Sequence, residues 1–146
     1  MPEEHRNIYK TARRDSGYTQ EAAAEMIAVS VESLRAYENG YRIPPNDIVE
    51  RMAHYYHTPQ LAYQHLQETN SLILQIVPQL QERSVLEMAV RMYLRLSQFQ
   101  QAHSVERLMA MAEDGRIDDQ ERPEFEAIMD DLREIIQSGL ELDVYA

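Results

Sequence analysis

Residues 19–40 read TQEAAAEMIAVSVESLRAYENG. Thr19 is a favourable N-cap for a short helix that extends to about Ile27, and Ser30 stands where a second helix would begin. The pair Asn39-Gly40 ends the second helix, because both residues tolerate the left-handed backbone that terminates helices. The stretch therefore predicts two short helices joined by a very tight turn.

The rest of the chain also has a helical period. Apolar residues recur three and four positions apart, only four glycines occur, and no hairpin dipeptide separates alternating runs. We therefore expect an all-α fold. The further helices that we expect run from about Glu3 to Asp15, Asn46 to Tyr56, Thr58 to Leu66, Gln79 to Ala102, Ser104 to Glu113 and Asp119 to Ser138.

Charge divides the sequence into two regions. Through residue 65, seven Lys and Arg stand against nine Asp and Glu, a net charge of -2. The remainder carries seven basic and sixteen acidic residues, a net charge of -9. We expect a five-helix domain over residues 1–66, followed by an acidic helical region over residues 67–146.

Two short helices joined by a tight turn are the layout of a helix-turn-helix, whose second helix lies in the major groove of DNA. Over about residues 6–66 the sequence also resembles the Cro and phage-repressor type of helix-turn-helix, the XRE family. The residues that carry the resemblance are Arg13 to Glu21, Ala24, Val29-Ser30, Leu34, Tyr37 to Gly40, Pro44 and Ala53 to Tyr56. The resemblance implies a lambda-repressor-like fold and a transcriptional regulator, a repressor, that reads operator DNA as a dimer.

The resemblance also implies contacts with double-stranded DNA around the two helices. The residues implied in phosphate binding are Thr19, Gln20, Asn39 and Arg42. The residues implied in base reading are Ser30, Val31, Glu32, Ser33 and Arg35.

The chemistry of three of these side chains suits the major groove. Arg35 could bind guanine through two hydrogen bonds, Glu32 could accept one from cytosine N4, and Val31 could pack on a thymine methyl group. Glu32 could instead pair with Arg35 or with the helix dipole, and both could simply belong to a solvated helix face. For Gln20 the alternative is an ordinary helix-cap role.

A structural role is implied for Arg13 and Glu38. In the family the matching pair forms a partly buried salt bridge that joins the first helix of the domain to the DNA-reading helix. Loss of one partner would leave a buried charge unpaired, at a cost of about 3–5 kcal/mol. We expect this pair to support the fold without touching DNA.

Three residues depart from the family pattern. Ala28 and His57 stand where glycine is common, and Ala23 replaces a larger core residue. A left-handed backbone costs a non-glycine residue about 1–2 kcal/mol. We therefore expect one or both turns to follow a slightly different path.

The composition excludes several other classes of protein. The sequence has no cysteine, which removes disulfides and thiolate sites and suits the reducing cytoplasm. Its most apolar stretch, Leu72 to Val77, is far shorter than the roughly 20 residues of a membrane span, and the N-terminus has no signal-peptide core. We therefore expect a cytoplasmic protein. Because no nucleophile with a base and no phosphate loop is present, we also expect no enzymatic activity and no cofactor.

Two patterns resemble metal sites. Asp114 to Glu121 matches the second half of a calcium loop, but the first and third loop positions fall on alanines. His54 and His57, with His65 nearby, lack a further fixed ligand for zinc. We expect a capped turn and hydrogen-bonded histidines rather than a metal site.

The acidic region has no recognisable chemistry, yet its long apolar arc from Leu80 to Phe99 requires burial on more than one side. We expect a homodimer through residues 67–146, because paired half-sites are read by symmetric dimers. A protein or small-molecule effector is a further option. The alternative function is a helix-turn-helix protein-interaction module, antitoxin-like or anti-repressor-like, with little or no DNA binding, which a domain of net charge -2 permits.

Overall fold

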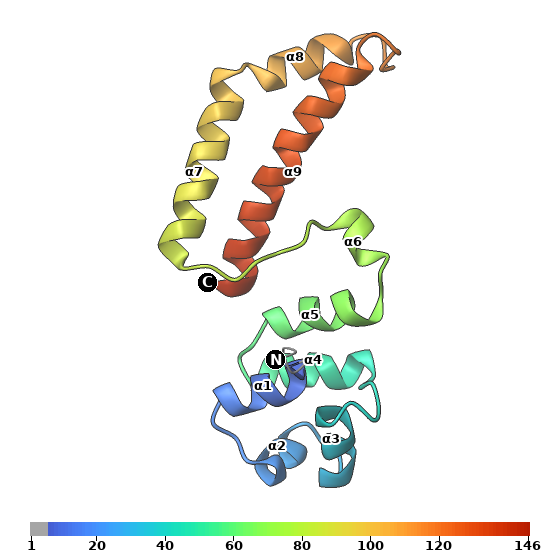
Figure 1. Cartoon of the computed structure of the whole chain (residues 1–146), viewed down its shortest axis with the longest axis vertical. Helices are drawn as coiled ribbons and strands as arrows, with labels where there is room; N and C mark the ends of the chain where they lie inside the picture. Colours follow the sequence, from blue (N-terminus) through green and yellow to red (C-terminus); the bar gives the residue numbers. More distant parts are fainter. Residues whose placement is uncertain (1–5) are drawn as a thin grey trace, which may run out of the picture. The chain divides into compact units, whose positions relative to one another are not determined.

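The computed structural model describes residues 6–146 and divides into two compact units, one ending at Ile73 and the other beginning at Leu74 (Figure 1). The described residues form nine α-helices and no β-strand, which confirms the all-α prediction. The first unit contains α1 (Ile8–Asp15), α2 (Gln20–Met26), α3 (Val31–Glu38), α4 (Asn46–Tyr55) and α5 (Gln60–Thr69). The second contains α7 (Val85–Gln101), α8 (Ser104–Met111) and α9 (Arg122–Tyr145), and the short α6 (Ile73–Ile76) crosses the boundary.

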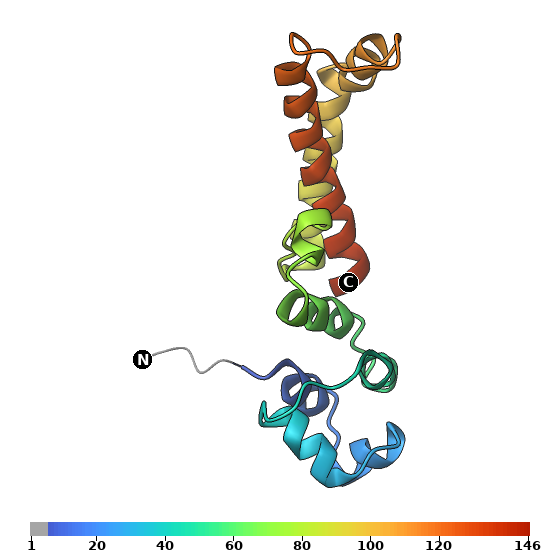
Figure 2. The same ribbon diagram turned by 90° about the vertical axis from the view of Figure 1, so that its right-hand side faces the viewer.

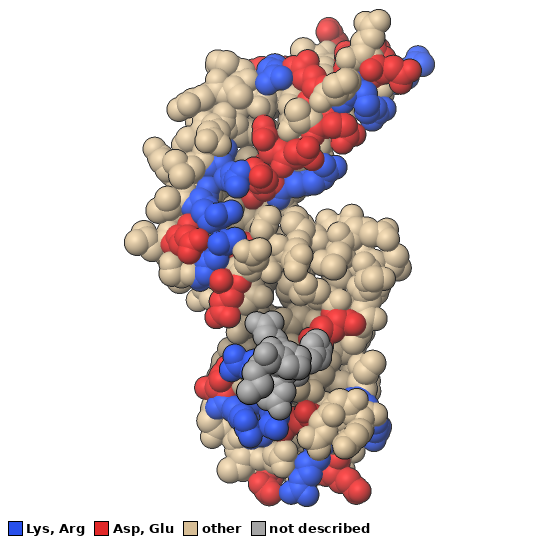
Figure 3. Space-filling model, in the orientation of Figure 1, with Lys and Arg blue, Asp and Glu red and all other residues tan. Residues whose placement is uncertain are grey.

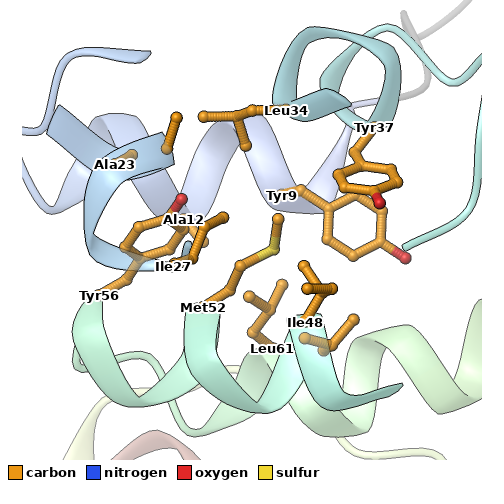
Figure 4. Close-up of a cluster of buried hydrophobic side chains, with 12 residues drawn as sticks. Tyr9, Ala12, Ala23, Ile27, Leu34, Tyr37, Ile48, Met52, Tyr56 and Leu61 are labelled. Carbon is orange, nitrogen blue, oxygen red and sulfur yellow. The ribbon is translucent and has the colours of Figure 1, made fainter. Parts of the chain in front are cut away.

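The helices of the first unit enclose one apolar core (Figure 4). Four large side chains from different parts of the unit have no exposed surface: Ile27, Leu34, Met52 and Leu61. Eight more buried residues complete this core: Tyr9, Ala12, Ala23, Ala24, Tyr37, Ile48, Val49 and Tyr56. This is the five-helix fold that the sequence predicts, and its core holds α3 by one face.

The first helix starts later than predicted. The side chain of Asn7 accepts a hydrogen bond from the backbone N–H of Lys10 over 2.9 Å, so Asn7 is the N-cap and α1 begins at Ile8. The predicted start near Glu3 lies outside the described residues, and a helix running continuously from there is wrong because Asn7 has extended backbone.

The long helix of the second unit also starts later than predicted, at Val85 rather than Gln79. The hydroxyl of Ser84 accepts a hydrogen bond from the N–H of Glu87 and caps the helix there. The preceding segment is held outside the helix, since the N–H of Gln81 donates to the carboxylate of Glu141 over 3.0 Å.

The last helix was predicted from Asp119 to Ser138 but runs from Arg122 to Tyr145. Its start is delayed because the Asp118 carboxylate accepts the N–H groups of the two residues before Arg122, which holds them in a turn. Neither α9 nor any other helix within residues 6–146 combines the length and the apolar character needed to cross a membrane.

In the second unit α7 and α9 lie side by side and run in opposite directions, with α8 joining their ends (Figures 1 and 2). Phe99, Met111 and Ile128 are buried together, one from each helix. Arg95 of α7 forms an ion pair with Glu134 of α9. The unit is thus a helical hairpin with a thin apolar seam and charged contacts along it.

Candidate nucleic-acid interface

Ala28 closes the turn between α2 and α3. It has a left-handed backbone, with φ of 58°, and its N–H donates to the carbonyl of Glu25 over 3.2 Å. The next N–H, of Val29, donates to the carbonyl of Ala24 over 3.0 Å, and this pair of bonds ends α2 and reverses the chain. His57 is also left-handed, with φ of 52°. Both residues therefore adopt the left-handed backbone that glycine takes without strain, at a cost of about 1–2 kcal/mol each. That one or both turns differ slightly from the usual path of the family stays a prediction.

Helix α3 is anchored by one face and exposed on the other. Leu34 and Tyr37 are buried in the core, and Val31 is half-buried against it. Glu32 and Arg35 are exposed. The core therefore fixes the direction in which the polar face of α3 projects.

Serine hydroxyls organise the start of α3. Ser30 accepts a hydrogen bond from the N–H of Ser33 over 3.0 Å and donates to the Ser33 hydroxyl over 2.9 Å. Ser30 thus acts as the N-cap, and its hydroxyl is already engaged at this helix end.

Arg13 of α1 and Glu38 of α3 form a buried ion pair. Nε and Nη2 of Arg13 lie 2.5 and 3.0 Å from the two carboxylate oxygens, and Nη1 donates to the carbonyl of Tyr18. The hydrogen bond with Glu38 raises the pKa of Arg13 against the opposing effect of burial. Burial and the nearby Glu38 carboxylate raise the pKa of Tyr56 to about 12. Arg13 therefore stays charged, and its hydrogen bonds with Glu38 tie α1 to α3.

Gln20 connects this buried pair to the surface. Its Nε2 donates to Oε2 of Glu38 over 2.9 Å, and its Oε1 accepts a hydrogen bond from Nε of Arg35 over 3.0 Å. Nη2 of Arg35 also lies 3.8 Å from a carboxylate oxygen of Glu21, in an exposed ion pair. Arg35 is thus turned toward α2, with Glu21 rather than Glu32 as its ion-pair partner.

The end of α3 carries a second polar group. Asn39 is exposed and is the C-cap, and Gly40 follows with a left-handed φ of 76°. The guanidinium of Arg42 lies 5.5 Å from the centre of the Tyr37 ring, a cation–π contact. The predicted residues at this end, Asn39 and Arg42, are therefore both exposed.

The charges of the first unit are mixed in sign. Figure 3 shows a small group of Lys and Arg side chains over α1, with Asp and Glu side chains beside it and further charges of both signs on the rest of the face that it presents. The ion pair between Arg35 and Glu21 is an example on the polar face of α3. Attraction of a polyanion must therefore come from a few specific residues and not from a broad positive field.

His65 is a hydrogen-bonded residue of the fold. It is buried, and its ring nitrogens contact the Tyr9 hydroxyl at 2.7 Å and the side-chain oxygen of Asn46 at 3.0 Å. Burial lowers the pKa of His65.

The stretch from Asp114 to Glu121, which resembles half of a calcium loop, is a turn in the structure. The Asp114 carboxylate accepts the N–H of Arg116 and caps this turn. Within residues 6–146, no group of three or more His, Asp or Glu side chains is arranged to hold a metal ion.

A protein-family model described as "Helix-turn-helix" matches residues 10–59. The matched span contains α2, α3, the turn between them and α4, together with most of α1. Comparison with curated proteins and with solved structures gave no match.

Proposed function

We propose that residues 10–59, which match the helix-turn-helix family model, are a DNA-binding domain of the Cro and phage-repressor type, and that the protein is a transcriptional repressor. It reads an operator sequence with α3 in the major groove, as a dimer. The observation that carries the proposal is the anchoring of α3, whose inner residues Leu34 and Tyr37 are buried while Glu32 and Arg35 are exposed on its outer side.

Phosphate contacts on either side of the groove hold the domain in register. Thr19 and Gln20 lie at the start of α2, and Asn39 and Arg42 lie beyond the end of α3. Contact with a DNA backbone requires exposed side chains. Thr19, Asn39 and Arg42 are exposed, and Gln20 is half-buried. These contacts position the protein without selecting a sequence.

Base contacts come from the front of α3. Glu32 accepts from cytosine N4, and Arg35 reads guanine after it leaves Glu21. The half-buried Val31 offers only its outer edge to a thymine methyl group. The N-cap Ser30 and the neighbouring Ser33 add hydrogen bonds to the first base pairs that α3 meets, because the Ser33 hydroxyl keeps its proton free and the Ser30 hydroxyl keeps one lone pair free.

A dimer through residues 67–146 places two copies of α3 on two half-sites. The acidic character of this region, with a net charge of -9 beyond residue 65, keeps it away from the phosphates and leaves DNA contact to the first unit. Repression follows because an operator covered in this way is closed to other proteins. The protein acts in the cytoplasm and needs no catalytic step, metal or cofactor.

Fluorescence anisotropy of labelled mixed genomic DNA, measured over a salt series, tests this function. We expect binding at low salt that weakens steeply as salt rises, and Gln20→Ala weakens binding to all sequences alike. Arg133→Ala, in an exposed ion pair of the second unit, is the matched control and leaves binding unchanged. Absence of salt-dependent binding at low salt overturns the proposal.

One observation favours the alternative, a protein-interaction module. Arg35 is occupied by Gln20 and by the Glu21 carboxylate, and the first 65 residues carry a net charge of -2. A domain with a slightly negative net charge, whose exposed arginine is already paired, suits a protein partner better than a polyanion. Failure to bind DNA in the anisotropy experiment favours this alternative.

A further inference from the structure

Three basic side chains gather at the surface around the first helix. Arg6 precedes α1, and Lys10 and Arg14 stand four residues apart on it, so these two share one face of the helix. All three line a hollow of about 310 Å³. Figure 3 shows Lys and Arg side chains over α1. We call Arg6, Lys10 and Arg14 the α1 basic cluster.

The α1 basic cluster forms no ion pair within residues 6–146. Two carboxylates line the same hollow, but Glu38 is paired with Arg13, and Asp15 forms no ion pair with the cluster. Six arginines elsewhere at the surface do pair with a carboxylate: Arg35, Arg51, Arg83, Arg95, Arg107 and Arg133. In a chain with a net charge of -11, three cations left together in this way indicate a site for an anion that the described chain does not supply.

The stability of α1 does not explain the cluster. Lys10 lies in the first turn of α1, where the helix dipole disfavours a positive charge, and this turn contains no acidic residue. The dipole favours Arg14, which lies in the last turn, but it favours neither Lys10 nor Arg6. An anion bound beside the first turn would interact favourably with both the dipole and the cluster.

Hydrogen bonds hold the cluster beside the end of α3. Nδ2 of Asn7 donates to the carbonyl of Tyr37 over 2.9 Å, and its side-chain oxygen accepts the N–H of Lys10. Asn7 also lines a second hollow, of about 380 Å³, together with Asn39 and Arg42. The cluster is therefore continuous with the end of α3, to which we assign phosphate contacts.

We propose that the α1 basic cluster binds the phosphate backbone of DNA, and that it continues the row of phosphate contacts which begins at Asn39 and Arg42. Lys10 and Arg14 are about 6 Å apart along the helix axis, so they contact separate phosphates. This inference rests on the proposed function, because it extends the surface by which the domain binds DNA. It also supplies a local attraction for phosphate to a domain whose net charge is -2.

The arrangement of the cluster favours a nucleic acid over an acidic protein. Its cations form a row that runs on to Arg42, and a DNA strand offers a matching row of regularly repeated charges. Exposed ion pairs with carboxylates contribute little, whereas each phosphate contact gains from the release of counterions condensed on DNA.

The salt dependence of DNA binding tests the inference. Lys10→Gln with Arg14→Gln removes two charges, and Gln is a good helix former. Each phosphate contact contributes about 0.9 to the slope of log affinity against log salt concentration. In fluorescence anisotropy with mixed genomic DNA, we therefore expect this double variant to lower the slope by about 2 and to weaken binding at low salt by at least about 10-fold.

Two further double variants separate contact from net charge and from folding. Arg116→Gln with Arg133→Gln removes the same charge from exposed residues of the second unit and should leave the slope unchanged. Lys10→Arg with Arg14→Lys keeps both charges and should keep the slope. Selection of bound sequences from random DNA should return the same preference for the natural protein and the Lys10, Arg14 glutamine variant, because phosphate contacts do not select a sequence.

Circular dichroism reports whether the variants keep their helices. If the double glutamine variant of α1 unfolds, Lys10→Gln alone replaces it, with an expected loss of about 1 in slope. A folded variant that keeps the natural slope, or an equal loss in the control from the second unit, overturns this inference and leaves the proposed function standing. A natural protein that does not bind DNA at all refutes the proposed function and this inference together, so the two failures are distinct.

Discussion

The guanidinium of Arg35 donates a hydrogen bond to the side-chain oxygen of Gln20, with 3.0 Å between Nε and Oε1. The amide of Gln20 in turn donates to Glu38, which is fixed by its buried ion pair with Arg13. A continuous chain of hydrogen bonds thus runs from the interior of the domain to the exposed face of α3. Glu21 lies 3.8 Å from Nη2 of the same guanidinium, so this carboxylate competes with any DNA atom that approaches Arg35 Nη2.

Replacement of Glu21 by Gln should strengthen DNA binding by about 2–5-fold at low salt. The exposed ion pair with Arg35 is worth at most about 1 kcal/mol, and its loss frees the arginine while removing one charge that repels phosphate. Anisotropy titrations measure the change. Glu25→Gln, an exposed carboxylate of the same helix outside this ion pair, is the control and should have a smaller effect. Equal effects of the two substitutions would show that Glu21 does not restrain Arg35.

Arg35→Ala and Arg42→Ala should weaken DNA binding in different ways. Arg35 lies on α3 and is proposed to read a base, so its loss should reduce discrimination at one base pair by about 1–3 kcal/mol. Arg42 is proposed to bind phosphate, so its loss should weaken binding to all sequences alike and reduce the salt slope by about 1. Selection of bound sequences from random DNA, followed by salt titrations, separates the two. Unchanged base preference in the Arg35 variant would assign that side chain to the backbone instead.

Glu38→Gln should destabilise the domain by about 3–5 kcal/mol, because it leaves Arg13 buried without a counter-charge. Replacing both partners, Arg13→Met with Glu38→Leu, should cost much less, since no unpaired charge is left. Urea denaturation followed through the tyrosine signal in near-ultraviolet circular dichroism measures both. Asp130→Asn, in an exposed ion pair with Arg133, is the control and should cost less than about 1 kcal/mol. A double variant as unstable as the single one would contradict this explanation.

The sequence predicts the local features of the domain and misses those that depend on tertiary contacts. Thr19 and Ser30 were predictable as caps because a cap bonds to a backbone only three residues away. The bonds of Gln20 to Glu38 and Arg35 join residues 18 and 15 positions apart, and no spacing rule indicates them. The start of α7 was misplaced because Leu80 continues the apolar period, although it lies outside the helix. The roles of the site residues in DNA binding stay predictions.

His65 should make the stability of the first unit depend on pH. The neutral ring satisfies both of its contacts when Nδ1 accepts from Tyr9 and Nε2 donates to Asn46. Because burial lowers the pKa of His65 below 6.5, the unfolded chain binds a proton first as pH falls. This contribution to the free energy of unfolding is therefore complete above about pH 6.5 and is lost below it, toward the folded pKa.

Urea denaturation at a series of pH values checks this dependence. His65→Gln should flatten the profile below pH 6.5, whereas His54→Gln, at an exposed histidine, should leave it unchanged. A profile that keeps its slope without His65 would assign the effect to another group.

Ala28→Gly should stabilise the domain, against the usual effect of glycine. The left-handed backbone at Ala28 costs about 1–2 kcal/mol, which glycine avoids, while its greater freedom in the unfolded chain takes back about 0.4–1 kcal/mol. The net gain should be about 0–1.6 kcal/mol in urea denaturation. Ala36→Gly, inside α3, is the matched control and should lose about 1 kcal/mol, because glycine is a poor helix former. DNA affinity should not change with Ala28→Gly, since the turn already has the path that glycine would take, and a loss of stability would mean that this turn is unstrained.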